Sequence, residues 1–217
     1  HMMVITLKCS NNCKYCQVSA EGDEAKGFDM SPEVARRVVD YIFKSPSLSI
    51  KIEFQGGEPT LNWETLKKTV LYAEEINKIH KKHLSFVVCT NLVPIVRSQL
   101  LFFKEHGINI STSLDGPRNL HDKNRVLRNG DGTYDTVIKN LYSSFDILLR
   151  GNVNALMTTT VDNVDHLKEV IEEYVRLGFN GIFIRSLNPY GLAVENVDDL
   201  GYPIEHFVEK YVEALDF

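Results

Sequence analysis

The sequence lacks any apolar run that approaches the ~18 residues of a membrane-spanning helix. It also lacks a basic excess, because 24 lysines and arginines stand against 29 aspartates and glutamates, and it has no basic stripe to neutralise nucleic-acid phosphates. No charged segment followed by an apolar one and a small-residue cleavage site marks a leader. We therefore expect a cytoplasmic protein with neither nucleic acid nor membrane as partner.

Cysteine is scarce and unevenly placed. The chain of 217 residues has four, of which Cys9, Cys13 and Cys16 are clustered and Cys89 is distant. Disulfide scaffolds are typically short and secreted, whereas this chain has 43% apolar content and enough length for a substantial core. The cluster therefore favours metal binding over disulfides, and we expect Cys89 to pack as a small core hydrophobe.

Short β-branched runs alternate with stretches of helical period. The predicted strands are Met3–Leu7, Ile50–Phe54, Leu84–Cys89, Ile108–Leu114, Val153–Thr158 and Gly181–Ile184. Strand–helix repetition predicts an α/β fold with parallel strands, and six units suggest a partial (β/α)6 TIM-like barrel that is laterally open, with a doubly wound sheet as the alternative. His1 and Met2 resemble a cloning remnant, so we expect one domain over residues 3–217.

The first predicted helix has a recognisable start and an apolar stripe. Ser31 followed by Pro32 is a typical N-terminal pair, and Val34, Val38 and Ile42 are expected on the buried face.

Unusual residues follow five of the predicted strands. They are the segments 9–16, 55–59, 90–91, 113–117 and 185–191. Carboxyl ends of parallel strands share one edge, which is where ligands and chemistry collect in such folds. We therefore expect these segments to form one site.

The clustered thiols leave two kinds of metal site open. A structural zinc site normally uses four protein ligands, and the histidines at 80 and 83 are distant in sequence. An iron–sulfur cluster held by three thiolates leaves one iron open to substrate or cofactor.

The other segments also have two interpretations. Gly56 and Gly57 could form only a turn, or could expose backbone to a ligand. Glu58 could fix this loop or meet a ligand ammonium group, and Asp115 could merely hold its own backbone. Arg125 is a candidate partner for a carboxylate.

The spacing Cys9-x3-Cys13-x2-Cys16 resembles the signature of the radical S-adenosylmethionine superfamily, and the sequence GGEP at 56–59 is similar to its glycine-rich motif. The resemblance implies a partial (β/α)6 barrel in which the three cysteines hold a 4Fe-4S cluster. It further implies that S-adenosylmethionine binds the fourth iron and is cleaved reductively to a 5′-deoxyadenosyl radical, which abstracts hydrogen from the substrate.

Carried over by position, the resemblance implies a set of cofactor-binding residues: Tyr15, Gln55, Gly56, Gly57, Glu58, Ser113, Asp115, Arg125 and Leu187. Tyr15 and Leu187 would lie near adenine, and the backbone of 55–57 would meet the methionyl amine. Ser113 would bind the methionyl or ribose part. A bulky residue at position 57 would then weaken S-adenosylmethionine binding while sparing the cluster.

The segments FQGGEPTL, TSLDGP and HDKNR resemble the peptide-modifying branch, with its anaerobic sulfatase-maturating enzymes and thioether-forming maturases. CKYCQVSA and GFNGIFIRSLNPYG are similar to the His-Xaa-Ser system maturases. This implies a peptide or protein substrate with His-Xaa-Ser repeats, and a reductase such as flavodoxin or ferredoxin. That branch usually continues into a cysteine-rich extension absent here, so we expect a truncated core. A zinc-binding module and a non-catalytic peptide-binding module remain alternatives.

Overall fold

The computed structural model describes residues 1–217. Its strands are β1 (Met2–Thr6), β2 (Lys8–Cys9), β3 (Glu21–Gly22), β4 (Ser49–Gly56), β5 (His83–Cys89), β6 (Ile108–Ser113), β7 (Val153–Thr158) and β8 (Phe183–Arg185). Its helices are α1 (Pro32–Ile42), α2 (Trp63–His80), α3 (Arg97–Glu105), α4 (Arg118–Asn124), α5 (Tyr134–Leu148), α6 (Leu167–Leu177), α7 (Leu192–Glu195), α8 (Val197–Leu200) and α9 (Ile204–Leu215). Short 3-10 turns lie at Pro59–Asn62, Arg150–Asn152 and Val164–His166. None of the helices has the length and apolar character needed to cross a membrane.

Six strands form one sheet in the order β1-β4-β5-β6-β7-β8, and each neighbouring pair is parallel. The order never reverses, as it would in a doubly wound sheet, and β1 does not pair with β8. The prediction of a laterally open (β/α)6 barrel is therefore confirmed. The six strands also lie where the sequence predicts them, with shifts of one or two residues at most ends.

The sheet has a buried outer face and a more accessible inner face. Along β4, Ile50, Ile52 and Phe54 are fully buried, whereas the residues between them are exposed or half-buried. The buried side chains join a core with the inner stripes of the surrounding helices, for example Leu66 and Val70 of α2. The period of two along a strand therefore separates a packed face from one that lines the barrel interior.

Helix α1 begins as predicted, because the Ser31 hydroxyl accepts a hydrogen bond from the Val34 amide at 3.3 Å. Its buried face differs from the prediction, however: Ala35, Val39 and Ile42 are buried, while Val34 is 45% exposed. The sequence holds two adjacent apolar stripes, and the helical period alone does not decide which one faces the core.

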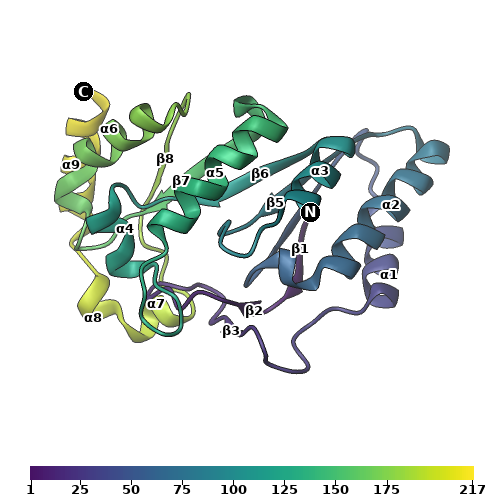
Figure 1. Ribbon diagram of the computed structural model, residues 1–217, viewed down its shortest axis with the longest axis horizontal. Coiled ribbons are helices and arrows are strands. Elements are labelled where there is room, and N and C mark those ends of the chain that lie inside the picture. Colours follow the sequence, from purple (N-terminus) through teal and green to yellow (C-terminus); the bar gives the residue numbers. More distant parts are fainter.

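The chain gathers its irregular segments along one edge of the barrel. In Figure 1 the short strands β2 and β3 and the short helices α7 and α8 lie together along the lower edge. These are the segments that follow β1 and β8, at opposite ends of the sheet. The carboxyl edge of the sheet is thus covered by loops drawn from both ends of the sequence.

Candidate active site

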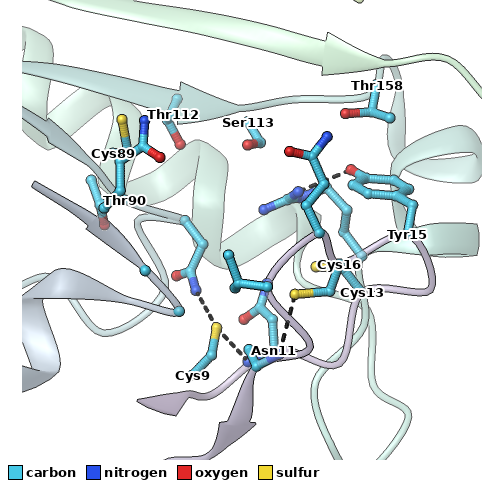
Figure 2. Close-up of a pocket in the computed structure, with 18 of the residues that line it drawn as sticks. Cys9, Asn11, Cys13, Tyr15, Cys16, Cys89, Thr90, Thr112, Ser113 and Thr158 are labelled. Atoms are coloured by element: carbon cyan, nitrogen blue, oxygen red, sulfur yellow. Dashed lines mark hydrogen bonds between the residues drawn. The ribbon is translucent and has the colours of Figure 1, made fainter. Parts of the chain in front are cut away.

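A single cavity at this edge brings together most of the residues singled out from the sequence. It encloses about 880 Å³, including its mouth open to solvent. Nine of the twelve predicted site residues line it: Cys9, Tyr15, Cys13, Cys16, Gln55, Gly56, Gly57, Ser113 and Arg125. Figure 2 shows Cys13, Cys16 and Tyr15 on one side of this cavity, Cys89 and Thr90 on the opposite side, and Cys9 below and between them. The expectation that these segments converge is confirmed in the geometry.

The cysteine loop is held on one side by the segment 124–128. The amides of Asn12 and Lys14 donate to the carbonyls of Val126 and Asn124, at 2.8 and 3.1 Å. The Arg128 side chain donates to the carbonyl of Cys9 at 3.1 Å and to that of Ala20 at 2.6 Å. The HDKNR motif and the residues that follow it, up to Arg128, therefore hold the cysteine loop in place. The sequence alone did not reveal this role.

The segment that begins at Gly191 holds the other side of the loop. The Leu192 amide donates to the carbonyl of Cys16 at 2.9 Å, and the Asn196 side chain donates to that of Lys14 at 2.8 Å. Gly191 has φ +56°, and a Cβ there would lie 2.5 Å from the Cys16 oxygen. Only glycine fits this close approach without strain.

The three thiols differ in environment. The Cys9 sulfur accepts hydrogen bonds at 3.4 Å from the Asn11 amide and from the Asn91 side-chain amide, and the Cys16 sulfur accepts one from the Ala20 amide at 3.4 Å. Burial, with a contribution from the nearby Glu58 carboxylate, raises the pKa of Cys9 to about 12. A bound metal centre would supply the positive charge that a buried thiol such as Cys9 needs in order to ionise.

The spacing of the three thiols indicates which kind of metal centre they could bind. No three histidine, cysteine, aspartate or glutamate side chains lie close enough together for one metal ion. All three thiols nevertheless line the same cavity. Because a cluster of several atoms separates its ligands more widely than a single ion does, the arrangement fits a three-cysteine iron–sulfur cluster better than a closed zinc site.

The glycine motif packs directly against the start of the cysteine loop. Gly56 has φ +134°, and a Cβ on it would lie 1.9 Å from the Thr6 carbonyl oxygen. A Cβ on Gly57 would lie 2.3 Å from the oxygen of Lys8, and the Gly57 amide already donates to Thr6 at 2.9 Å. Bulk at position 57 would therefore also displace the backbone that leads into Cys9.

Glu58 is turned into the protein and does not line the cavity. One carboxylate oxygen accepts from the amide and the hydroxyl of Thr60, at 3.1 and 2.7 Å, and the other accepts from the Asn91 amide at 2.7 Å. Of the two roles considered for Glu58, the structure forms the one in which it fixes the loop. Burial raises the pKa of Glu58, and these hydrogen bonds oppose that effect.

Tyr15, Asp115 and Arg125 form a buried chain of polar contacts. The Tyr15 hydroxyl donates to the Asp115 carboxylate and accepts from Arg125 Nη1 at 2.9 Å. The other Asp115 oxygen accepts from the Thr158 amide at 3.1 Å. Burial opposes the charge of Arg125, but Cys13, Tyr15 and Asp115 keep its pKa well above the usual value. Asp115 thus lies behind the cavity wall, while Tyr15 and Arg125 form part of it.

Leu187 also lies outside the cavity lining. It packs against a small apolar cluster of Tyr15, Ala193 and Leu200, and its amide donates to the Tyr202 hydroxyl at 2.8 Å. Leu187 is therefore part of the apolar packing around the cluster that includes Tyr15.

Unpaired polar atoms accumulate at this cavity. Six buried side-chain nitrogen and oxygen atoms lack a hydrogen-bond partner, and four of them belong to lining residues: Asn11, Thr112, Arg125 and Arg185. Buried polar groups are normally paired, so such a concentration is typical of a site that binds a polar ligand. S-adenosylmethionine, with its amino, carboxylate and hydroxyl groups, has the chemistry to pair with them.

Sequence reasoning placed Asn91 and Arg185 in the expected site segments but gave neither a role. The Asn91 side-chain amide donates to the Cys9 sulfur, and Arg185 lines the cavity while donating to the Thr158 hydroxyl at 2.9 Å. Cys89 was expected in the core, which is wrong: it faces the barrel interior, lines the cavity and donates to Glu53 at 3.3 Å. Its position at the last residue of β5, in phase with the inner face, was the available signal.

Comparison with known proteins agrees with this geometry. Residues 3–202 match the Radical SAM superfamily. The radical SAM cyclopropyl synthase TigE of Paramaledivibacter caminithermalis is 25% identical, over 99% of this chain and 46% of its own. A cysteine-type anaerobic sulfatase-maturating enzyme of Clostridium novyi is 28% identical, over 83% of this chain and 49% of its own. This chain spans about half the length of these relatives.

Solved structures share the fold. The structure described as native anSMEcpe with bound AdoMet and Kp18Cys peptide superposes with a TM-score of 0.77 at 22% identity, over 86% of this chain and 50% of that one. HydG, a maturase of the [FeFe]-hydrogenase, gives a TM-score of 0.67 at 15% identity, over 99% of this chain and 48% of that one. With its thiols, glycine motif and open barrel in the arrangement described above, the chain belongs to the radical SAM superfamily.

Proposed function

We propose that residues 3–217 form the catalytic core of a peptide- or protein-modifying radical SAM enzyme. The observation that carries this proposal is the convergence of three thiols, a glycine motif and several unpaired polar atoms on one cavity. Neither a turn nor a structural zinc site accounts for all three features together.

In this proposal Cys9, Cys13 and Cys16 hold a 4Fe-4S cluster. The cluster, when bound with S-adenosylmethionine, supplies the electron that generates a 5′-deoxyadenosyl radical for hydrogen abstraction. Arg125 faces the cavity with a charge suited to a carboxylate, and Ser113 offers a hydroxyl at the end of β6. Tyr15, held by Asp115 and Arg125, presents a fixed aromatic wall for the adenine.

In this proposal the glycine motif binds S-adenosylmethionine through its backbone, and its Glu58 supports that backbone. Gln55, Gly56 and Gly57 line the cavity, and in this proposal their backbone meets the methionyl amine. Glu58 keeps that backbone in place through Thr60 and Asn91. We propose that Leu187 acts in the same supporting way for Tyr15.

The proposed substrate is a peptide. Relatives of this chain include sulfatase-maturating enzymes, and one structural neighbour contains a bound peptide. On the resemblance of its motifs, we propose a peptide with His-Xaa-Ser repeats as the particular substrate, and a flavodoxin or ferredoxin as the electron donor. Four free thiols are consistent with a reducing compartment such as the cytoplasm.

The test is anaerobic reconstitution with iron and sulfide, reduction, and detection of 5′-deoxyadenosine from S-adenosylmethionine. We expect the product to form, and we expect it to carry deuterium when the peptide is a His-Ala-Ser repeat deuterated at carbon. A protein that binds only zinc, or that forms no 5′-deoxyadenosine, would contradict the radical mechanism. Product without deuterium from any labelled position would contradict the His-Xaa-Ser substrate.

A further inference from the structure

Beyond the cavity, the inner face of the sheet carries accessible polar residues beside apolar ones such as Val4 and Val87. Buried residues alternate along β4 and β7 with residues that are exposed or half-buried, among them Lys51, Glu53 and Asn154. Ser85 on β5 is exposed in the same way. In a closed barrel such positions are filled by packed apolar side chains. Here they form a solvated surface that can meet a polar partner.

Glu53 is the anionic group of this surface. It lies on β4, close in sequence to the lining residue Gln55. Its Oε1 accepts hydrogen bonds from the Cys89 thiol at 3.3 Å and from the Gln55 side-chain amide at 2.5 Å. Its Oε2 has only Lys51 Nζ, at 3.6 Å, and the Lys51 side chain is 59% exposed. One oxygen is therefore fixed in the wall, while the other is available to an incoming donor.

Both residues that fix Glu53 also line the cavity. In Figure 2 Cys89 lies at the far end from Tyr15, the residue proposed to contact adenine. The charged residues of the lining are Arg125 and Arg185, both cationic. A cationic group entering the barrel is thus attracted toward the β4–β5 side, where Glu53 stands.

We propose that Glu53 Oε2 is a substrate subsite that binds a protonated side-chain nitrogen of the peptide, such as an ammonium, guanidinium or imidazolium group. The inference rests on the proposed function, since it places the substrate next to the cofactor cavity. Burial would raise the pKa of Glu53, but its bonds with Gln55, Cys89 and Lys51 lower the pKa instead, so the carboxylate is ionised at neutral pH. Lys51 acts as a mobile counter-ion that the substrate cation replaces.

The test compares peptides of Lys-Ala-Ser and Gln-Ala-Ser repeats, in which one residue per repeat is either a cationic lysine or a neutral glutamine. Binding to the reconstituted protein with S-adenosylmethionine is measured by calorimetry for wild type, Glu53→Gln, Lys51→Gln and the control Glu75→Gln. Glu75 lies on the outer helix α2 with a 67% exposed side chain, so its variant makes the same charge change away from the barrel. Glu53→Gln keeps an acceptor for Cys89, and the structure gives no reason for it to unfold.

We expect wild type to prefer the lysine peptide by about fivefold, as for a partly screened ion pair. Glu53→Gln should abolish the preference, Lys51→Gln should increase it, and Glu75→Gln should leave it unchanged. Absence of a preference in wild type, or an equal preference in Glu53→Gln, would overturn the subsite. Formation of 5′-deoxyadenosine without peptide is measured in parallel, so a failed subsite is distinguished from a failed radical mechanism.

Discussion

The side chain of Asn91 donates a hydrogen bond to the sulfur of Cys9 at 3.4 Å, although 82 positions separate the two residues. The same residue accepts from the Val93 amide through Oδ1 at 2.8 Å, which fixes the orientation of its amide group. Asn91 also connects to the glycine motif, because its backbone amide donates to Glu58. One residue just after β5 thus orients two parts of the site.

Asn91→Ala should weaken the hold on the cluster, because a donor to the ligand sulfur is lost. Outer partners of metal ligands typically contribute about tenfold or more to metal affinity. We expect iron to be lost faster to a chelator and the cluster's reduction potential to become more negative, measured by iron assay and potentiometric EPR. Asn154→Ala, at an exposed position on β7, is the control and should match wild type. Equal retention and potential in both variants would contradict the role of Asn91.

Cys13→Ala should abolish cluster binding, whereas Cys89→Ala should retain it. Both thiols line the cavity, but Cys89 donates to Glu53 and lies away from the cysteine loop. Iron and sulfide content after reconstitution distinguishes the two variants. Full iron content in Cys13→Ala, or loss of iron in Cys89→Ala, would mean that the ligand set is assigned wrongly.

Gly57→Ala should destabilise the protein and reduce its iron content together, because the new Cβ meets the oxygens of Lys8 and Leu7 at 2.3 and 2.6 Å. Overpacking against backbone of this kind costs about 1–3 kcal/mol. Gly151→Ala is the matched control, since nothing lies within 4 Å of its added carbon. Denaturant unfolding and iron assay give the two readouts. A Gly57→Ala protein with weaker S-adenosylmethionine binding but wild-type stability and iron content would support the simpler ligand-contact role instead.

His121 should make folding stability sensitive to mild acid. Burial, with a further contribution from Arg125, lowers its pKa well below the usual 6.5. Its Nδ1 accepts from the Asp115 amide at 3.3 Å, and its Nε2 lies 3.0 Å from the Thr133 hydroxyl. Thr133 donates its own proton to the carbonyl of Arg125, so Nε2 is the donor and the ring is neutral.

The sign follows from proton binding. Below pH ~6.5 the unfolded state protonates this histidine while the folded state does not, so the free energy of unfolding falls as pH falls, by up to ~1.4 kcal/mol per pH unit. His121→Asn keeps an acceptor for Asp115 but does not titrate, so its unfolding free energy should fall less steeply between pH ~6.5 and 5. Denaturant unfolding across this range compares the two proteins, and equal slopes would contradict the assignment. Comparing the two also removes the opposing contributions of the buried acids Glu58 and Asp115, which both proteins share.

The backbone arrangement could be predicted from the sequence because local patterns determine it. The six barrel strands are β-branched runs with a clear period, and Gly178 ends α6 with φ +84° just before β8, as its sequence position suggests. Predicting which helix face is buried was harder. In α1 two neighbouring stripes are both apolar, and packing against α2 selects the one with Val39.

The site could be predicted to the level of its segments but less well to the level of side-chain direction. Glu58 and Asp115 follow the correct strands, yet each carboxylate turns inward to hold backbone amides. Such orientation depends on partners that are distant in the chain, for example Thr158 for Asp115. Cys89 was misplaced for a different reason, because its phase along β5, which puts it on the inner face of the sheet, was overlooked.

The support that the HDKNRVLR segment gives to the cysteine loop also depends on residues that are distant in the chain. Arg128 contacts the carbonyl of Cys9 across 119 positions, and no local pattern encodes such a contact. Position 191 is similar, because only the close approach of the Cys16 carbonyl in the folded chain requires a glycine there. These contacts exist only in the folded chain, so a sequence without aligned relatives does not reveal them.

The most direct test of the central claim is EPR spectroscopy of the reduced, reconstituted protein before and after addition of S-adenosylmethionine. A 4Fe-4S cluster held by Cys9, Cys13 and Cys16 has one iron without a protein ligand facing the cavity, so its spectrum should change when S-adenosylmethionine binds. A signal that stays identical at saturating S-adenosylmethionine, or a protein that takes up no cluster at all, would contradict the account.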